Sequence, residues 1–584
     1  MNVVLTTLNA KYTHSSLALR YLREYCQVLP CSFIIKEFSI NQQLLAILGE
    51  IYEEKPDVIG LSCSIWNIEM TLELSSLIKK VMPDVVLVCG GPEVSYDAQA
   101  LLEKCSAIDY VVEGEGEETF YQLLDCLLRN EQFPALPALS YRLPDGKFVI
   151  GAPAVVADLN TLPFPYQDPE MINLQDKIIY YESSRGCPFS CQYCLSSATR
   201  GVRFLAVERV LADLKFFIRH QVRQVKFVDR TFNTRKEHYL AIWRFLTQVN
   251  CTTNFHFEIS VDLLDAESLA VLAKMPQGRI QLEIGVQSTN PVTLQRIQRI
   301  NHWEKITTNV NYLMALKTMH LHLDLIVGLP EEDYASFARS FNDVYNLQPD
   351  MLQIGFLKML KGAGITKNAA SDGYVFMEQA PYQVLANSWL GYKDVYQLTI
   401  FTEIFEQYYN SGRFRNTLRY LVDQLAGDAF NLFDRLTDYW RKYSWQRLAH
   451  SNKSLYEKLM SFCKSEFSDK IADVEQLLKL DALFSDKGQV TPEFLPWSKA
   501  EYYEQTSEFW RSERVQKYLP EFKFTNWRNL QKHYHIEVFD FLVSEWLQSG
   551  KLISGREAVL FEYHTRDIKI KCISYNDLLG EGKV

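Results

Sequence analysis

Long hydrophobic runs are missing from this sequence. No stretch of 18 apolar residues occurs in its 584 residues, so a transmembrane helix is not expected. The first residues, Met1-Asn2-Val3-Val4-Leu5, have neither the basic segment nor the apolar stretch of a secretory signal peptide. We therefore expect a cytoplasmic protein without membrane partners, in which cysteines remain thiols or metal ligands.

An excess of positive charge is also missing. The chain has 61 lysine and arginine residues against 71 aspartate and glutamate residues, a net charge of −10. This balance argues against broad binding to nucleic acids or anionic membranes. Hydrophobic residues make up 47% of the chain, which is enough for large buried cores, and the length suggests about three or four domains.

Cysteine is sparse, and nine of the 12 cysteines are scattered singly. Most of these, such as Cys63 and Cys89, lie in apolar runs where a thiol packs as a small hydrophobe. The other three follow a strand-like run at residues 178–181, in the segment Ser184-Arg185-Gly186-Cys187-Pro188-Phe189-Ser190-Cys191-Gln192-Tyr193-Cys194.

This segment predicts a single metal centre. Gly186 and Pro188 favour a tight loop that turns the sulfurs of Cys187, Cys191 and Cys194 toward one soft metal. Because an iron-sulfur cube needs four donors, three cysteines leave one iron without a protein ligand. Structural zinc with a distant histidine is an alternative, and it would indicate a zinc-stabilised, non-catalytic binding protein. No second Cys-x2-Cys or Cys/His pair lies within zinc-ribbon distance, which disfavours that alternative.

The Cys-x3-Cys-x2-Cys pattern, with Tyr193 before its last cysteine, resembles the cluster loop of the radical S-adenosylmethionine (radical SAM) enzymes. The resemblance implies a 4Fe-4S cluster on these cysteines. It also implies that the open iron binds the amino and carboxylate groups of S-adenosylmethionine (SAM).

Residues 1–135 alternate strand-like and helix-like segments, which predicts a doubly wound parallel sheet. The predicted strands are Val3–Leu8, Phe33–Phe38, Val58–Ser62, Val85–Cys89 and Tyr110–Glu113. In such sheets ligands lie beyond the carboxyl ends of the strands. Glycines and small hydroxyl residues at these ends leave room for a large flat ligand, although a tight turn alone would also explain the glycines.

Together these segments resemble the Rossmann-like cobalamin-binding domain fused to many radical SAM enzymes. The resemblance implies cobalamin as a third cofactor, and we assign its contacts to Ser62, Ser64, Gly90, Gly91, Glu113 and Gly114. The cobalt-ligating motif Asp-x-His-x-x-Gly is absent, because none of the 11 histidines has an aspartate two positions before it. We therefore expect no histidine on the lower face of cobalt, and a hydrogen-bonded rather than ligating His14.

Seven prolines between residues 134 and 169 predict an ordered linker at 136–177. Its turn at Asp145-Gly146 predicts a small hairpin of Leu139–Arg142 against Lys147–Ile150. From 178 to 375 the alternation returns and predicts a partial (β/α)6 barrel of the TIM type, with its chemistry at the carboxyl ends of the strands. The six strand candidates are Ile178–Ser183, Gln224–Val228, Phe255–Ile259, Ile280–Val286, Leu321–Val327 and Leu352–Leu357.

The radical SAM resemblance covers this barrel and implies contacts to SAM from Tyr193, Asp229, Glu258, Ser260, Gln287 and Gly328. Asp229 stands where the family has a Gly-Gly-Glu segment, which is a departure from the pattern. Each of the residues at the strand ends could instead be a local cap of its strand.

Residues 376–584 predict a mainly helical domain of unassigned role, with strand-like segments at Leu560–Tyr563 and Ile568–Ile573. The two resemblances imply an enzyme that cleaves SAM reductively, forms a radical on a small-molecule or peptide substrate and methylates an unactivated carbon. A cobalamin-assisted cyclisation or rearrangement is the alternative. An electron donor such as flavodoxin or ferredoxin is also implied.

Overall fold

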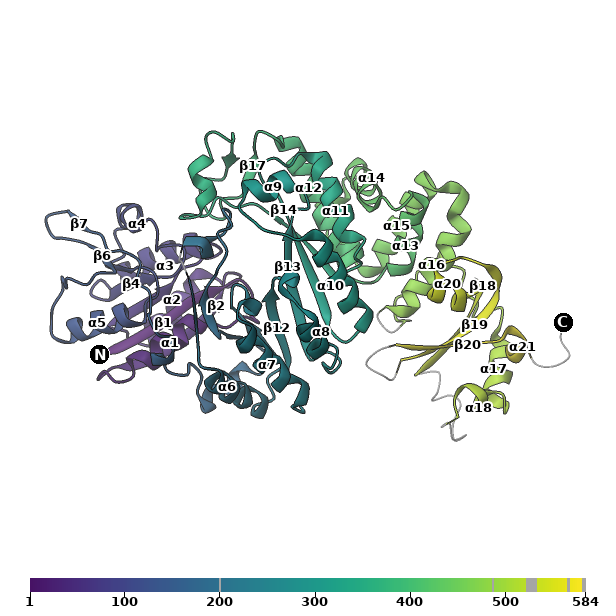
Figure 1. Cartoon of the computed structure of the whole chain (residues 1–584), viewed down its shortest axis with the longest axis horizontal. Helices are drawn as coiled ribbons and strands as arrows, with labels where there is room; N and C mark the ends of the chain where they lie inside the picture. Colours follow the sequence, from purple (N-terminus) through teal and green to yellow (C-terminus); the bar gives the residue numbers. More distant parts are fainter. Residues whose placement is uncertain (199–200, 486–487, 521–532, 564–567, 580–584) are drawn as a thin grey trace. The chain divides into compact units, whose positions relative to one another are not determined.

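The structure is a computed structural model that describes residues 1–198, 201–485, 488–520, 533–563 and 568–579. The chain divides into two compact units, residues 1–395 and 396–584 (Figure 1). The first unit holds two large sheets whose pairings are mainly parallel, and the second holds helices and a small antiparallel sheet. None of the helices in the described ranges combines the length and the apolar character of a membrane span.

The first sheet has the order β2-β1-β3-β4-β5-β6-β7. Its first five strands pair in parallel, which confirms the predicted doubly wound sheet. The predicted hairpin also forms, and it continues this sheet because β6 pairs antiparallel with β5. The strands are β1 (Asn2–Asn9), β2 (Ser32–Ser39), β3 (Val58–Ser62), β4 (Val86–Gly90), β5 (Tyr110–Val112), β6 (Leu139–Arg142) and β7 (Phe148–Val149).

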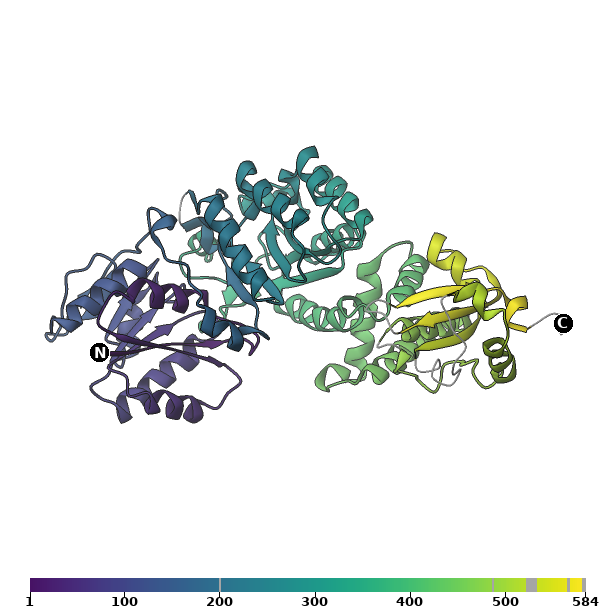
Figure 2. The same cartoon turned by 90° about the horizontal axis from the view of Figure 1, so that it is seen from below.

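Helices cover both faces of this sheet (Figure 2). Successive strand residues point to opposite sides, so each face of the sheet has apolar side chains that a layer of helices buries. Val3 and Leu5 pack into the core that contains Leu19, whereas Val4 packs into the core that contains Ile47. The helices are α1 (Leu17–Cys26), α2 (Leu44–Glu53), α3 (Ile68–Val81), α4 (Ala98–Lys104) and α5 (Glu117–Leu128).

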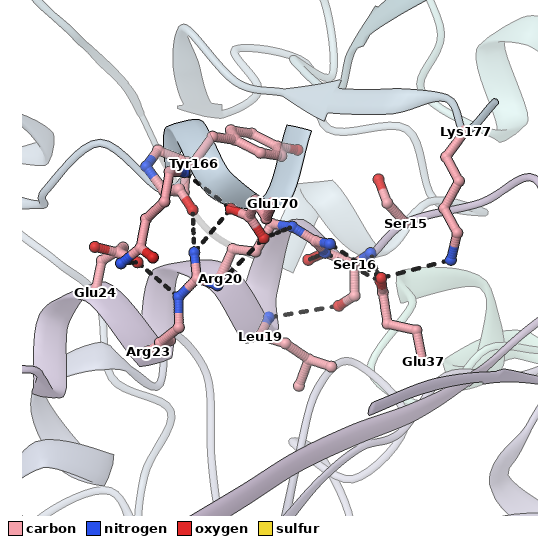
Figure 3. Close-up of polar contacts among 12 residues, drawn as sticks. Ser15, Ser16, Leu19, Arg20, Arg23, Glu24, Glu37, Tyr166, Glu170 and Lys177 are labelled. Atoms are coloured by element: carbon pink, nitrogen blue, oxygen red, sulfur yellow. Dashed lines mark hydrogen bonds and ion pairs between the residues drawn. The ribbon is translucent and has the colours of Figure 1, made fainter. Parts of the chain in front are cut away.

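The segment between the two sheets is fastened to the first domain by ion pairs (Figure 3). Glu170, in the short helix η2 (Asp168–Leu174), lies 2.8 Å from Arg23 Nη2 and 3.3 Å from Arg20 Nε. Arg20 Nη2 also lies 3.0 Å from Glu37 Oε2, and these two side chains are only 4% and 6% exposed. Buried charges need such partners, so the proline-rich segment is an ordered part of the unit.

The second sheet confirms the predicted partial barrel. All of its pairings are parallel and follow chain order, β15-β14-β13-β12-β11-β8, with β8 and β15 at the two ends. Its strands are β8 (Ile179–Tyr181), β11 (Gln224–Phe227), β12 (Asn254–Ile259), β13 (Ile280–Gln287), β14 (His320–Val327) and β15 (Met351–Phe356). Its helices are α6 (Val207–Arg219), α7 (Lys236–Gln248), α8 (Ala266–Leu272), α9 (Pro291–Arg296), α10 (Trp303–Leu316) and α11 (Tyr334–Tyr345).

The second unit is mainly helical, as predicted, and its longest helices are α13 (Arg415–Gln424), α14 (Ala429–Lys442), α15 (Asn452–Glu466) and α16 (Ile471–Phe484). It also contains an antiparallel sheet of β18 (Tyr534–Phe541), β19 (Ser554–Glu562) and β20 (Lys569–Ile573). The last two strands match the predicted strand-like segments, although residues 564–567 lie outside the described ranges. Strand β18 was missed because four consecutive residues, 536–539, are buried, which hides the two-residue alternation.

Candidate functional site

The three clustered cysteines lie on a loop that follows β9 (Ser184–Gly186), which pairs antiparallel with β10 (Val202–Phe204). Gly186 has a φ of 98°, and a Cβ there would lie 2.1 Å from the carbonyl oxygen of Gly201, so the loop requires glycine at this position. Farther along, the N–H of Gln192 donates to the carbonyl of Ile297 at 2.9 Å. The loop is therefore anchored at more than one point.

Asp229 supports the start of this loop. Its carboxylate accepts hydrogen bonds from the Ser183 N–H at 2.9 Å, the Ser183 hydroxyl at 2.7 Å and the Ser184 hydroxyl at 2.6 Å. Burial raises the pKa of Asp229 to about 6. Both oxygens are thus committed to the backbone and side chains that precede the cysteines, an arrangement that favours a positioning role over the predicted contact with SAM.

The cysteine thiols are gathered in a partly closed environment. Cys187 and Cys191 are buried and Cys194 is half-buried. The Sγ of Cys187 lies 3.7 Å from the Thr231 hydroxyl, and Arg299 Nη1 lies 3.8 Å from the Sγ of Cys191. Burial raises the pKa of the Cys191 thiol, and the guanidinium of Arg299 opposes that rise.

This donor set fits a 4Fe-4S cluster, because three thiolates come from one loop and a guanidinium lies against one sulfur. Arg299 also donates to the Tyr193 hydroxyl at 3.1 Å and to the carbonyl of Gly285. Tyr193 therefore lies beside the cysteine loop. Sequence reasoning missed Arg299, which is far from the cysteines in sequence and carries no local motif.

Two predicted SAM contacts at the strand ends engage in local interactions. The N–H of Ser260 donates to Asn233 Oδ1 at 2.9 Å, and its hydroxyl donates to Asp262 Oδ1 at 2.6 Å. Gln287 ends β13 with a φ of 72°, and its Nε2 occupies the space where a Cβ of residue 285 would stand. Both residues shape the ends of their strands.

Gly328 lies in a turn after its strand, whereas Glu258 lies beside a charged side chain of the barrel. Gly328 follows β14 with a φ of 92°, and its carbonyl accepts from the Tyr374 hydroxyl at 3.1 Å, so it serves a turn. Glu258 lies inside the barrel, 3.6 Å from Lys226 Nζ. Burial raises the pKa of Glu258 to about 7, and Glu283 adds to that rise.

A cavity of about 800 Å³ opens at the carboxyl ends of β3, β4 and β5. Four of the residues predicted to contact cobalamin line it, namely Ser62, Gly90, Gly91 and Gly114. Ser64 and Glu113 do not. The N–H of Ser64 donates to Asn67, and Glu113 accepts from the Ser140 hydroxyl.

The backbone around this cavity is shaped for a ligand that approaches closely. Gly91 and Gly114 have φ angles of 113° and 79°. A Cβ would lie 2.5 Å from the Cys63 carbonyl oxygen at the first position and 2.4 Å from the Ala154 carbonyl oxygen at the second. The bare backbone and the cavity volume fit a large cofactor at this sheet edge.

The cavity is also lined by Glu182, Arg185 and Arg230 from the barrel. Arg185 Nη2 lies 2.6 Å from Glu117 and 2.7 Å from Glu182, and its Nη1 lies 3.3 Å from Glu115. Sequence reasoning assigned no role to Arg185, although it stands two residues before the first cysteine of the motif.

His14 does not line this cavity, and no histidine of the described ranges is among its lining residues. Residue 14 forms a bridge with Ile178, and its ring lies 5.9 Å from the ring of Tyr180. Burial lowers the pKa of His14. The absence of histidine from cobalt remains a prediction.

Comparisons with known proteins agree with this arrangement. Residues 3–124 match the family described as the B12 binding domain, and residues 181–344 match the radical SAM superfamily. Residues 371–561 match a family described as a protein of unknown function (DUF4080). These matches imply a 4Fe-4S cluster, SAM and cobalamin as cofactors.

Several proteins are similar to parts of the chain. The cobalamin-dependent radical SAM methyltransferase TokK of Streptomyces tokunonensis is 30% identical over 50% of this chain and 44% of its own length. The anaerobic magnesium-protoporphyrin IX monomethyl ester cyclase of Rubrivivax gelatinosus is 23% identical over 51% of this chain and 55% of its own. The chain thus spans about half the length of these curated relatives.

Among solved structures, the cobalamin-dependent SAM radical enzyme OxsB with aqua-cobalamin bound has a similar fold. It aligns with a TM-score of 0.58 at 15% identity, over 84% of this chain and 82% of its own. At this identity the likeness concerns the fold. The chain therefore combines a match to the B12 binding domain and a match to the radical SAM superfamily in one polypeptide.

Proposed function

We propose that this protein is a cobalamin-dependent radical SAM methyltransferase that acts on an unactivated carbon. The observation that carries the proposal is that the cavity at the first sheet and the cysteine loop share residues of one segment within the first unit. The cavity at the carboxyl edge of the first sheet is lined by Arg185, which lies two residues before Cys187. A cofactor in that cavity and a cluster on the cysteines would therefore act on one shared space.

The chain's own residues would hold the groups as follows. Cys187, Cys191 and Cys194 would bind the cluster, and Arg299 would fix Cys191 and Tyr193 in place. Gly90, Gly91 and Gly114 would admit cobalamin to the sheet edge. When bound, the cluster with SAM supplies one-electron cleavage chemistry, and cobalamin supplies a transferable methyl group.

The barrel interior would orient the substrate through charged side chains. Glu258, with a pKa raised to about 7 by burial and by Glu283, could hold a proton near neutral pH. Lys226, which lies 3.0 Å from Glu283, keeps a positive charge in the same space. We further propose an external donor such as flavodoxin or ferredoxin, and a cytoplasmic location, since an oxygen-sensitive cluster requires reducing conditions.

The test is anaerobic reconstitution followed by mass analysis of the products of SAM, with and without cobalamin. The proposal expects S-adenosylhomocysteine whose formation requires cobalamin and, under reduction, 5′-deoxyadenosine. Deoxyadenosine alone, with no cobalamin-dependent S-adenosylhomocysteine, would contradict methyl transfer. That result would favour a radical cyclisation or rearrangement, the second candidate, which the similarity to a cyclase supports.

A further inference from the structure

A group of charged and imidazole side chains lies on one face of the barrel sheet. On β13, buried Leu282 and Ile284 alternate with Glu283, so Glu283 lies on the same face as position 285. That face looks toward Arg299, because a Cβ at position 285 would lie 3.5 Å from Arg299 Nη2. Strand pairing sets His322 beside Glu283, and Asp324 follows two residues later on the same face.

Several atoms of this group lack hydrogen bonds. His322 is 6% exposed, yet its Nε2 has no hydrogen-bond partner among the described residues. The same holds for Oδ1 of Asp324, although these two atoms are only 3.0 Å apart. Nε2 of His256 also has no hydrogen-bond partner, although it lies 2.8 Å from Oε2 of Glu283. Buried polar atoms normally have partners, so these atoms require an explanation.

One shared cation explains the short, poorly aligned approach of these atoms. Ligand atoms about 2.0–2.2 Å from a metal stand about 3 Å from one another, which is the spacing of His322 and Asp324. One ligand atom each of Glu283, His322 and Asp324 all lie within 4.8 Å of one another. An ion among them would satisfy the imidazole nitrogen and the carboxylate oxygens together.

Lys226 positions Glu283 for this role. Its Nζ donates a hydrogen bond to Oε2 of Glu283 at 3.0 Å, which leaves Oε1 of Glu283 without a hydrogen bond among the described residues. Metal-bound carboxylates are commonly held by such a donor on the second oxygen.

We propose that Glu283, His322 and Asp324 bind one divalent first-row transition-metal ion inside the barrel, separate from the cysteine cluster. One imidazole and two carboxylates suit zinc and its neighbours in the first transition row, and His256 stands close enough to complete the set. The proposal concerns metal binding, so it stands or falls independently of the proposed methyl transfer.

The experiment uses the full chain with its iron-sulfur cluster reconstituted anaerobically, so that the thiolates are occupied. The protein is equilibrated with zinc, dialysed and analysed for zinc and iron by mass spectrometry. We expect one zinc per chain beside four irons. Asp324→Asn and His322→Gln should each weaken zinc binding by more than the roughly 10–100-fold typical of an outer-shell change, with iron unchanged.

His220→Ala provides the matched control, because His220 Nε2 lies 2.8 Å from Asp168 Oδ1 in a hydrogen-bonded pair outside the barrel interior. It should keep full zinc binding. Unchanged iron content and circular dichroism show that a variant is folded, and zinc-dependent thermal stabilisation of the unmodified protein gives a readout that needs no variant. Absence of zinc from the cluster-loaded protein, or equal zinc in Asp324→Asn and the unmodified chain, would overturn the proposal.

Discussion

Arg185 joins the cysteine loop to the edge of the large cavity through Glu117. The guanidinium Nη2 lies 2.6 Å from the Glu117 carboxylate, and the two side chains are 14% and 7% exposed. Arg185 lies two residues before Cys187, and Glu117 begins α5 beside Gly114 and Gly116. This ion pair therefore couples the site that fits the cluster to the site that fits cobalamin.

Removing the guanidinium of Arg185 should lower the free energy of unfolding. Arg185→Met would leave Glu117 and Glu182 without their shared cation, whereas Glu115 would keep its ion pair with Arg203. Breaking such a buried pair typically costs about 3–5 kcal/mol. Urea unfolding of the full chain measures the loss. Arg129→Met is the control, because Arg129 pairs with Asp125 on an exposed helix surface and no measurable change is expected. Equal effects of the two substitutions would refute the assignment.

Bulk at position 90 should exclude cobalamin. A Cβ on Gly90 meets nothing closer than the Val112 carbonyl oxygen at 3.7 Å, so Gly90→Leu can fold while its side chain fills the cavity. Cobalamin bound per chain, measured by absorbance after desalting, should fall at least tenfold while iron content stays unchanged. Gly91→Trp should also lose cobalamin but adds backbone strain. Gly49→Ala on α2, where a Cβ meets nothing within 4 Å, is the control.

Full cobalamin occupancy in Gly90→Leu would show that the cavity is not the cobalamin site. Loss of both cobalamin and iron would show that the two sites do not fold independently of this position.

The Arg20–Glu37 pair predicts a loss of stability in acid. Burial alone would raise the pKa of Glu37, but Arg20 and Lys177 outweigh it and hold that pKa below its ordinary value. A depressed carboxyl pKa stabilises the fold above the ordinary value of about 4.3, and the contribution is lost as pH falls through the folded value. The unfolding free energy of the wild type should exceed that of Glu37→Gln by a constant amount above about pH 5.

This difference should then shrink as the pH falls below about 4.3. Glu50→Gln, at an exposed position of α2, provides the control. A gap between wild type and Glu37→Gln that is unchanged down to pH 3 would show that ionisation of Glu37 does not carry the effect.

Cobalt should carry no histidine nitrogen. Electron paramagnetic resonance of the cob(II)alamin form reports this directly, because an axial nitrogen splits each cobalt line into three. We expect lines without that splitting, since His14 packs against Tyr180 and does not line the cavity. Threefold splitting that disappears in His14→Ala would make His14 a ligand.

The sequence predicted the strands of the two large sheets closely, because each is either a short apolar run, as in β3 and β4, or an alternation of apolar and polar residues, as in β13 and β14. Val58–Ser62 is a strand in the structure with the same bounds. Strand β18 was not predicted, since Glu537 is buried against Lys479 and the strand lacks a simple alternation. Such a strand forms because of its packing against neighbouring elements, which a local sequence pattern does not show.

The candidate site could be predicted where the chemistry is local in sequence. The three residues Cys187, Cys191 and Cys194 are close in sequence, so their spacing predicts one loop without knowledge of the tertiary structure. Arg299 and the group around His322 were missed, because each depends on which strands become neighbours. The contact of Asp229 with SAM is implied by the resemblance, because this residue stands where the family has a Gly-Gly-Glu segment. Its oxygens accept hydrogen bonds from Ser183 and Ser184, and the contact with SAM stays a prediction.

The most direct test of the central claim is iron and acid-labile sulfide analysis of the anaerobically reconstituted protein, together with SAM cleavage. The account predicts about four irons and four sulfides per chain. Alanine at Cys187, Cys191 or Cys194 should abolish SAM cleavage, whereas alanine at Cys63 or Cys89, both buried in the core of the first sheet, should leave iron intact. A triple variant lacking all three loop cysteines that still held four irons and cleaved SAM would contradict the account.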